Sequence, residues 1–278
     1  MPAVVDVHQH AGPANATPDQ WRAGEQLRSE CETRLRRMDA LGIDAAVLGP
    51  VPSYLRPHGI ADTRVLNNAL RACADRAPDR FPLVAGVVEP LYGETALEEL
   101  HRMAAELGFA AFMLHPRLQG VASDDVWIRA CVREAGSLGM IALIHSYSDS
   151  RFESPVLLAR VAAENPDVQI VALDAFGSHH HSLECFDLAE RCPNVLFDTN
   201  MMFKWHVLDE VVDRFDGDRL VFGSNLYSSL SERPPPGPFI TPALLRERLT
   251  PAVAEKICVG NFVALLESVG RPVPPGFR

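Results

Sequence analysis

Short apolar runs alternate along the chain with longer segments in which apolar side chains recur every three to four residues. The short runs predict eight strands, at residues 4–10, 44–49, 83–88, 109–115, 140–145, 168–173, 194–199 and 219–223. The longer segments predict helices at 30–41, 63–77, 95–107, 124–138, 155–164, 181–191, 207–215, 242–256 and 261–270. Eight such units predict one domain over residues 1–278, an α/β fold of the (β/α)8 TIM-barrel type with an extra C-terminal helix. A doubly wound open sheet is the alternative, although no glycine-rich phosphate loop follows the first strand.

Composition narrows the class of protein. The chain has 278 residues, is 47% hydrophobic and carries a net charge of -10, without a lysine or arginine cluster. That balance argues against nucleic acid and anionic membranes as partners. No apolar run has the length of a membrane span and no signal-like start is present, so we expect a cytoplasmic protein. The six cysteines are scattered, which argues against disulfides and against a zinc site built of thiolates.

Polar residues follow the predicted strands. His8 and His10 end the first strand and, being two residues apart, point the same way, as two metal ligands would. The alternative is a half-buried strand whose histidines lie near the surface. In a barrel the carboxyl ends of the strands carry the catalytic groups. The groups that end strands four to eight are His115, His145, Asp174, Asp198 and Asn225.

Several short motifs are spread over nearly the whole chain. They are the DVHQH of residues 6–10, Leu114-His115-Pro116, His145, the CPNVLFD of 192–198, the DRLVFGS of 218–224 and the VGNF of 259–262. Together they resemble the amidohydrolase superfamily, in particular the branch of aminocarboxymuconate semialdehyde decarboxylase, hydroxybenzoate decarboxylases and lactone hydrolases.

The resemblance implies that His8, His10 and His145 hold a divalent metal, usually zinc, with manganese as another candidate. In that family an aspartate on strand eight completes the site, and Asn225 stands there instead. The family's strand-six histidine is replaced by Asp174. Met113 occupies the place of the bridging lysine of two-metal relatives, which argues for a single ion.

Asparagine cannot act as a base, and its neutral amide lowers metal affinity relative to a carboxylate. Three hypotheses follow. In the first, the histidines bind a metal and Asp174 is either a further ligand of that metal or the acid or base of a hydrolase or decarboxylase acting on a small anionic or cyclic carbonyl substrate. In the second, the same pocket performs metal-free lyase, isomerase or decarboxylase chemistry. In the third, the protein is a catalytically silent relative that binds a ligand.

Further residues are candidates around this site. His115 and Asn225 are candidate catalytic residues, although His115 could equally fill space under a loop. Arg117, Lys204 and Trp205 are candidate contacts for an anionic or aromatic small-molecule substrate, against the alternative of solvated loops. The histidines at 179–181 start a helix and point in three directions, so we expect no joint metal site there. The proline-rich segment 232–238 is a candidate lid or homodimer contact, or a plain surface connection.

Overall fold

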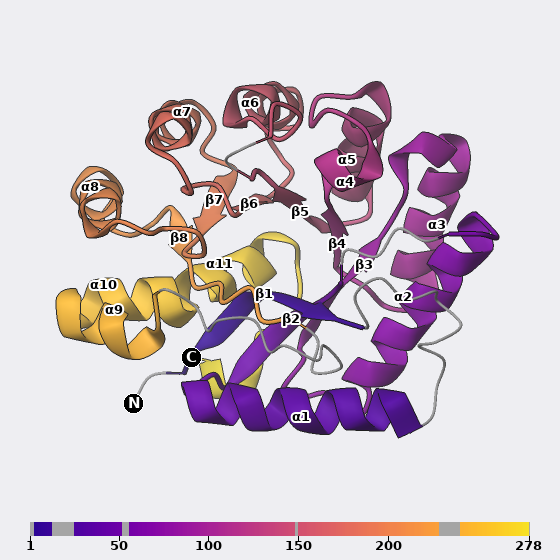
Figure 1. Ribbon diagram of the computed structural model, residues 1–278, viewed down its shortest axis with the longest axis horizontal. Coiled ribbons are helices and arrows are strands. Elements are labelled where there is room, and N and C mark those ends of the chain that lie inside the picture. The colour runs from indigo at the N-terminus through magenta and orange to yellow at the C-terminus, as the bar shows by residue number, and fades with distance from the viewer. Residues whose placement is uncertain (1–2, 13–24, 52–55, 148–149, 228–239, 278) are drawn as a thin grey trace.

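The computed structural model describes residues 3–12, 25–51, 56–147, 150–227 and 240–277. Eight parallel strands form one sheet in sequence order, β1 to β8 (Figure 1). Their bounds are β1 Val5–Ala11, β2 Ala45–Pro50, β3 Leu83–Val87, β4 Ala111–Leu114, β5 Ile141–His145, β6 Ile170–Leu173, β7 Val195–Asp198 and β8 Leu220–Val221. The sheet closes because Val7 N donates to Phe222 O (2.9 Å) and His10 N donates to Leu226 O (2.9 Å). The predicted (β/α)8 barrel is therefore confirmed.

The helices lie around the barrel, except that the last of them packs against the side chains inside it (Figure 1). They are α1 Glu25–Leu41, α2 Ile60–Ala74, α3 Glu94–Ala105, α4 Pro116–Gln119, α5 Val126–Ser137, α6 Pro155–Glu164, α7 His179–Arg191, α8 Trp205–Phe215, α9 Pro242–Arg248, α10 Pro251–Glu255 and α11 Asn261–Ser268. A π-helical turn, η3 (Lys256–Gly260), joins α10 to α11, and short 3₁₀ turns lie at η2 (Pro90–Tyr92) and η4 (Pro275–Phe277).

Successive side chains along each strand point alternately into and out of the barrel, and this divides the core into two clusters. Side chains such as Val5, Val47 and Leu143 form one cluster inside the barrel, which continues into Phe262 and Leu265 of the extra C-terminal helix α11. Residues of the opposite parity, such as Leu48 and Ile144, pack outward against the helices. Both faces of each strand are thus buried, as the continuous apolar runs predicted.

Besides shifts of a few residues at the ends of elements, the structure differs from the predicted elements in three places. The single helix expected at 242–256 is two helices, because Leu249 and Thr250 are extended and Pro251 starts a new helix, for which the Thr250 hydroxyl accepts from Val253 N. Helix α1 begins at Glu25, five residues before the expected start. The short helix α4 was not predicted, because four residues carry no measurable periodicity.

Within the described ranges, no helix is long and apolar enough to cross a membrane. All six cysteines are buried and free, as expected. The segment 232–238, considered above as a lid or homodimer contact, lies outside the described residues.

Candidate metal centre

Three histidines converge at the carboxyl-terminal edge of the strands, which we call the mouth of the barrel. His8 and His10 come from β1, and their Nε2 atoms are 2.9 Å apart. The ring of His145, at the end of β5, has its centroid 5.1 Å from that of His8 and 5.4 Å from that of His10. All three are buried, and one nitrogen from each lies within 4.8 Å of the others. We call His8, His10 and His145 the histidine cluster.

Each ring of the cluster directs Nδ1 away from the others. His8 Nδ1 lies 2.5 Å from Asp198 Oδ2, His10 Nδ1 is 2.7 Å from Pro50 O, and His145 Nδ1 is 2.9 Å from Leu114 O. These acceptors hold the proton on Nδ1 and leave the Nε2 lone pairs facing one another. In the described part of the chain, the buried His145 Nε2 has no hydrogen-bond partner. This donor set suits a divalent metal ion, which imidazole Nε2 atoms bind with Nδ1 held by an outer acceptor.

Since both Nδ1 atoms face acceptors and carry the ring protons, the 2.9 Å separation of the two Nε2 atoms is accounted for by an additional proton or by a metal ion between them. Burial alone would lower the pKa of His8, but the carboxylates of Asp174 and Asp198 outweigh it and raise that pKa. Burial lowers the pKa of His10 and of His145 well below the usual value, so these two rings are neutral. A proton on His8 is therefore the competitor of a metal ion.

Strand β1, which carries the histidine pair, is fixed from two sides. The buried carboxylate of Asp6 accepts hydrogen bonds from Ser224 N (2.9 Å) and Ser224 Oγ (2.5 Å), which joins β1 to the segment after β8. From the outside, the buried Arg34 of α1 donates to His10 O (2.5 Å) and pairs with Glu30 (2.6 Å). The two imidazoles are thus held by a closed hydrogen-bond network rather than by packing alone.

Asp198 is the residue of this centre to which the sequence assigned no role. It ends β7, is fully buried, and accepts from His8 Nδ1 with one oxygen and from Asp174 N (3.0 Å) with the other. Gly223 permits this approach, since a Cβ there would lie 2.8 Å from Asp198 Oδ2 and 3.1 Å from His8 Cβ. The sequence signal that could have identified Asp198 is an aspartate at the end of one apolar strand, with a glycine at the end of the next strand.

Asp174 and Asn225 lie on the mouth side of the cluster. Both have left-handed backbones (φ 62° and 53°), a conformation that Asp and Asn tolerate better than most residues. Asp174 Oδ1 is 3.8 Å from His8 Nδ1 and accepts a hydrogen bond from Asn200 Nδ2 at 2.5 Å. The Asn225 side chain lies beside His10, and its buried Oδ1 has no well-oriented hydrogen-bond partner among the described residues.

Two further rings enclose the cluster. His115 stacks on His145 with 3.2 Å between ring centroids, and Gln119 Oε1 accepts from His115 N (2.9 Å). Burial lowers the pKa of His115 well below its usual value, so it is a neutral group at the centre. Tyr227, which sequence reasoning did not single out, lies against His10 with 4.8 Å between centroids.

The three predicted substrate contacts lie in two different regions of the structure. Arg117 lies at the mouth, with its guanidinium 3.9 Å from the Tyr147 ring centroid. Lys204 is exposed and precedes α8, and Trp205 begins that helix with its ring under Arg248 of α9, at 5.0 Å. Trp205 lines an outer hollow of about 410 Å³ with residues of α9. Of these three residues, Arg117 is the one near the histidine cluster, since the helix that carries it begins directly after His115.

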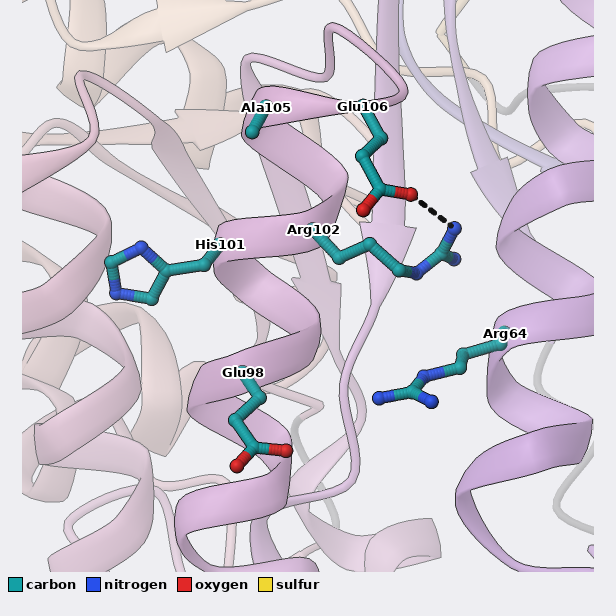
Figure 2. A pocket seen from close by; sticks show the side chains of 6 residues that line it. All are labelled: Arg64, Glu98, His101, Arg102, Ala105 and Glu106. Atoms are coloured by element: carbon teal, nitrogen blue, oxygen red, sulfur yellow. Dashed lines mark ion pairs between the residues drawn. The ribbon is translucent and has the colours of Figure 1, made fainter.

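A second hollow, of about 550 Å³, lies outside the barrel between α2 and α3 (Figure 2). Arg64 and Arg102 line it, and both pair with the buried Glu99, at 3.3 and 2.7 Å. Arg102 also reaches Glu106 at 3.8 Å, the ion pair drawn in Figure 2. Because its cations are already neutralised, this hollow is a surface ion-pair cluster rather than the functional site.

A closed (β/α)8 barrel with three convergent histidines at its mouth has the architecture of the metal-dependent barrel hydrolases and lyases. A family model described as amidohydrolase matches residues 5–267, so the chain belongs to the amidohydrolase family. The expected family and enzyme class are thereby confirmed. No curated protein matches the chain significantly.

Solved structures of similar fold span almost the whole chain. A 2,6-dihydroxybenzoate decarboxylase from Rhizobium is 20% identical, with a TM-score of 0.68 over 97% of this chain and 100% of that one. A 4-oxalomesaconate hydratase from Rhodopseudomonas palustris is 17% identical, with a TM-score of 0.70 over 96% of each chain. A 5-carboxyvanillate decarboxylase from Novosphingobium aromaticivorans, solved with manganese and 4-hydroxy-3-methoxy-5-nitrobenzoic acid, is 16% identical, with a TM-score of 0.70 over 96% of each chain. At these identities the likeness establishes the fold.

Proposed function

We propose that this protein is a metal-dependent decarboxylase of a small aromatic carboxylate. The observation that carries the proposal is the set of Nε2 atoms in the histidine cluster, which face one another while every Nδ1 is bonded outward. Similar folds named as decarboxylases, one of them solved with manganese, support the reaction class and favour manganese beside zinc as the ion.

In this proposal His8, His10 and His145 hold the ion. When bound, it supplies a positive charge that polarises a carboxylate or carbonyl oxygen of the substrate. Asn225 then contributes a neutral amide oxygen at the edge of the site, where a carboxylate would repel an anionic substrate.

Asp174 is the proposed acid and base. Decarboxylation breaks a carbon–carbon bond, releases CO2 and places one proton on the ring carbon. Asp174 is held by Asn200 and stands beside the cluster, so it can carry that proton from solvent to the ring. Hydrolysis of a cyclic ester, the other reaction expected from the sequence, would use Asp174 to take the proton of the attacking water.

The test is turnover of 2,6-dihydroxybenzoate and of 5-carboxyvanillate by protein loaded with manganese or zinc, followed as CO2 release. We expect His145→Ala to lose both bound metal and turnover, and Asp174→Asn to keep the metal and lose turnover. Equal turnover after chelation would favour the metal-free enzyme. Loaded protein that binds these acids without converting them would favour the silent relative.

A further inference from the structure

Glu153 is a buried carboxylate at the mouth that the proposed reaction does not use. Its side chain is 0% exposed and closes the loop that follows β5, where Ser146 Oγ donates to Glu153 O at 2.8 Å. One carboxylate oxygen accepts from Arg117 N at 3.0 Å. The other, Oε2, lies 3.5 Å from Arg117 Nε and is buried without a hydrogen bond from any described residue.

Arg117, its partner, is held on one side and open on the other. Its guanidinium stacks on Tyr147 at 3.9 Å, and Nε faces Glu153. Its terminal nitrogens have no hydrogen bond within the described ranges, and the side chain is 36% exposed. Arg117 belongs to the short helix α4 that begins directly after His115, so it lies next to the ring that stacks on His145. Its positive charge, after burial and the charges of His10 and His8, helps to lower the pKa of His115.

We propose that Arg117 and Glu153 form a proton-coupled anion site, in which Arg117 binds a non-reacting anionic group of the substrate while Glu153 takes up a proton. This inference rests on the proposed function, because it assigns to that substrate a second anionic group, such as a second carboxylate on the ring. Guanidinium terminal nitrogens are suited to such a carboxylate, which they bind with two parallel hydrogen bonds.

The coupling follows from the surroundings of Glu153. Burial raises the pKa of Glu153 to about 7, opposed by the Arg117 charge and the Arg117 and Tyr147 amides, while Asp174 across the mouth raises it further. An anion on Arg117 offsets the cation that stabilises the ionised carboxylate and adds a repelling charge. The pKa of Glu153 must then rise, and a proton from solvent forms an O–H bond at Oε2.

The experiment is calorimetric titration of manganese-loaded protein with isophthalate, which has two carboxylates, and with benzoate, which has one. Titrations at pH 7.5 in HEPES and in Tris, whose ionisation enthalpies differ, give the number of protons taken up. We expect isophthalate binding to take up a substantial fraction of a proton and benzoate binding to take up little. Arg117→Gln should abolish the preference for isophthalate.

Glu153→Gln keeps the contact to Arg117 N and removes the charge. It should abolish the proton uptake and bind isophthalate about fivefold more tightly than the unchanged protein at pH 8, as a rise of the Glu153 pKa from about 7 by about one unit gives, with almost no difference at pH 6. Glu164→Gln is the matched control, since Glu164 also pairs with arginines, Arg129 (3.0 Å) and Arg160 (3.4 Å), but on the outer helices. It should change neither quantity.

The outcomes separate this inference from the proposed function. Proton uptake that persists in Glu153→Gln, weaker binding by that variant at pH 8, or no preference for isophthalate would each overturn the anion site. Uptake that depends on Glu153 without turnover of any aromatic carboxylate would reject the reaction and retain the site. Turnover without such proton uptake would retain the reaction and reject the anion site.

Discussion

Asp198→Asn should weaken metal binding without unfolding the protein. Asp198 Oδ2 is 2.5 Å from His8 Nδ1, so its negative charge makes the opposite nitrogen, Nε2, a stronger ligand. An amide oxygen can still accept that hydrogen bond but lacks the charge, and the amide NH2 group replaces the oxygen that accepts from Asp174 N. Loss of such an outer partner costs about 10- to 100-fold in metal affinity, which corresponds to about 1.4 to 2.7 kcal/mol.

Asp174→Asn is the matched control, because it removes the same charge from the same neighbourhood. Asp174 Oδ1 lies 3.8 Å from His8 Nδ1, beyond hydrogen-bond distance. We therefore expect its replacement to reduce metal affinity by less than about threefold, since a neighbouring charge acts without fixing the ring.

The assay is calorimetric titration of chelator-treated protein with Mn²⁺ and with Zn²⁺, with the melting temperature of each apo variant as the check on folding. If both aspartate variants lose affinity equally, the effect is general electrostatics rather than the hydrogen bond to His8. If Asp198→Asn binds metal as tightly as the unchanged protein, the assignment of Asp198 as the outer partner of His8 is wrong.

Two other perturbations test the fold and the mouth. Asp6→Ala should lower the free energy of unfolding in urea by about 3 to 5 kcal/mol, because it leaves Ser224, His8 N and Gln9 Nε2 without their buried acceptor. The exposed Asp44 accepts one hydrogen bond, from Val4 N, so Asp44→Ala should lower that free energy by about 1 kcal/mol, and equal losses in the two variants would contradict the reasoning. Glu153 has a folded pKa of about 7 against 4.5, so its contribution to stability is complete below pH 4.5 and is lost as the pH rises through 7. Glu153→Gln should therefore match the unchanged protein near pH 4 and exceed it by about 3 kcal/mol at pH 8, measured by chemical denaturation, and a pH-independent difference would refute the shift.

The barrel could be predicted from the sequence because its signals are local. Each strand is a short apolar run, the next element assigned to its unit is a helix, and closure requires only that eight such units follow one another. The convergence of His8, His10 and His145 follows from the same topology, since parallel strands bring their carboxyl ends to one edge. The break at Thr250-Pro251 was also a local signal, which the apolar periodicity on either side concealed.

The partners of these residues could not be predicted, because they depend on register and on loop conformation. Asp174 and Asp198 end neighbouring strands, and the sequence favours the former only through a family position. Which carboxylate reaches His8 is decided by the space that Gly223 leaves and by the left-handed backbone at Asp174. Glu153, in the segment between β5 and α6, pairs with Arg117 of the short helix α4, a contact for which the sequence has no periodic signal.

The structure also changes how the substitution at Asn225 is understood. On the sequence alone, Asn225 removes a negative charge from the metal site and lowers its affinity. In the structure, Asp198 is a negative charge behind His8, where it strengthens a ligand without occupying the mouth. A carboxylate in the position of Asn225 would instead face an incoming anion. With Asp198 behind His8 and Arg117 at the mouth, the centre can attract a cation and still admit an anionic substrate. The comparison of Asp198→Asn with Asp174→Asn directly measures how much Asp198 contributes to the attraction of the cation.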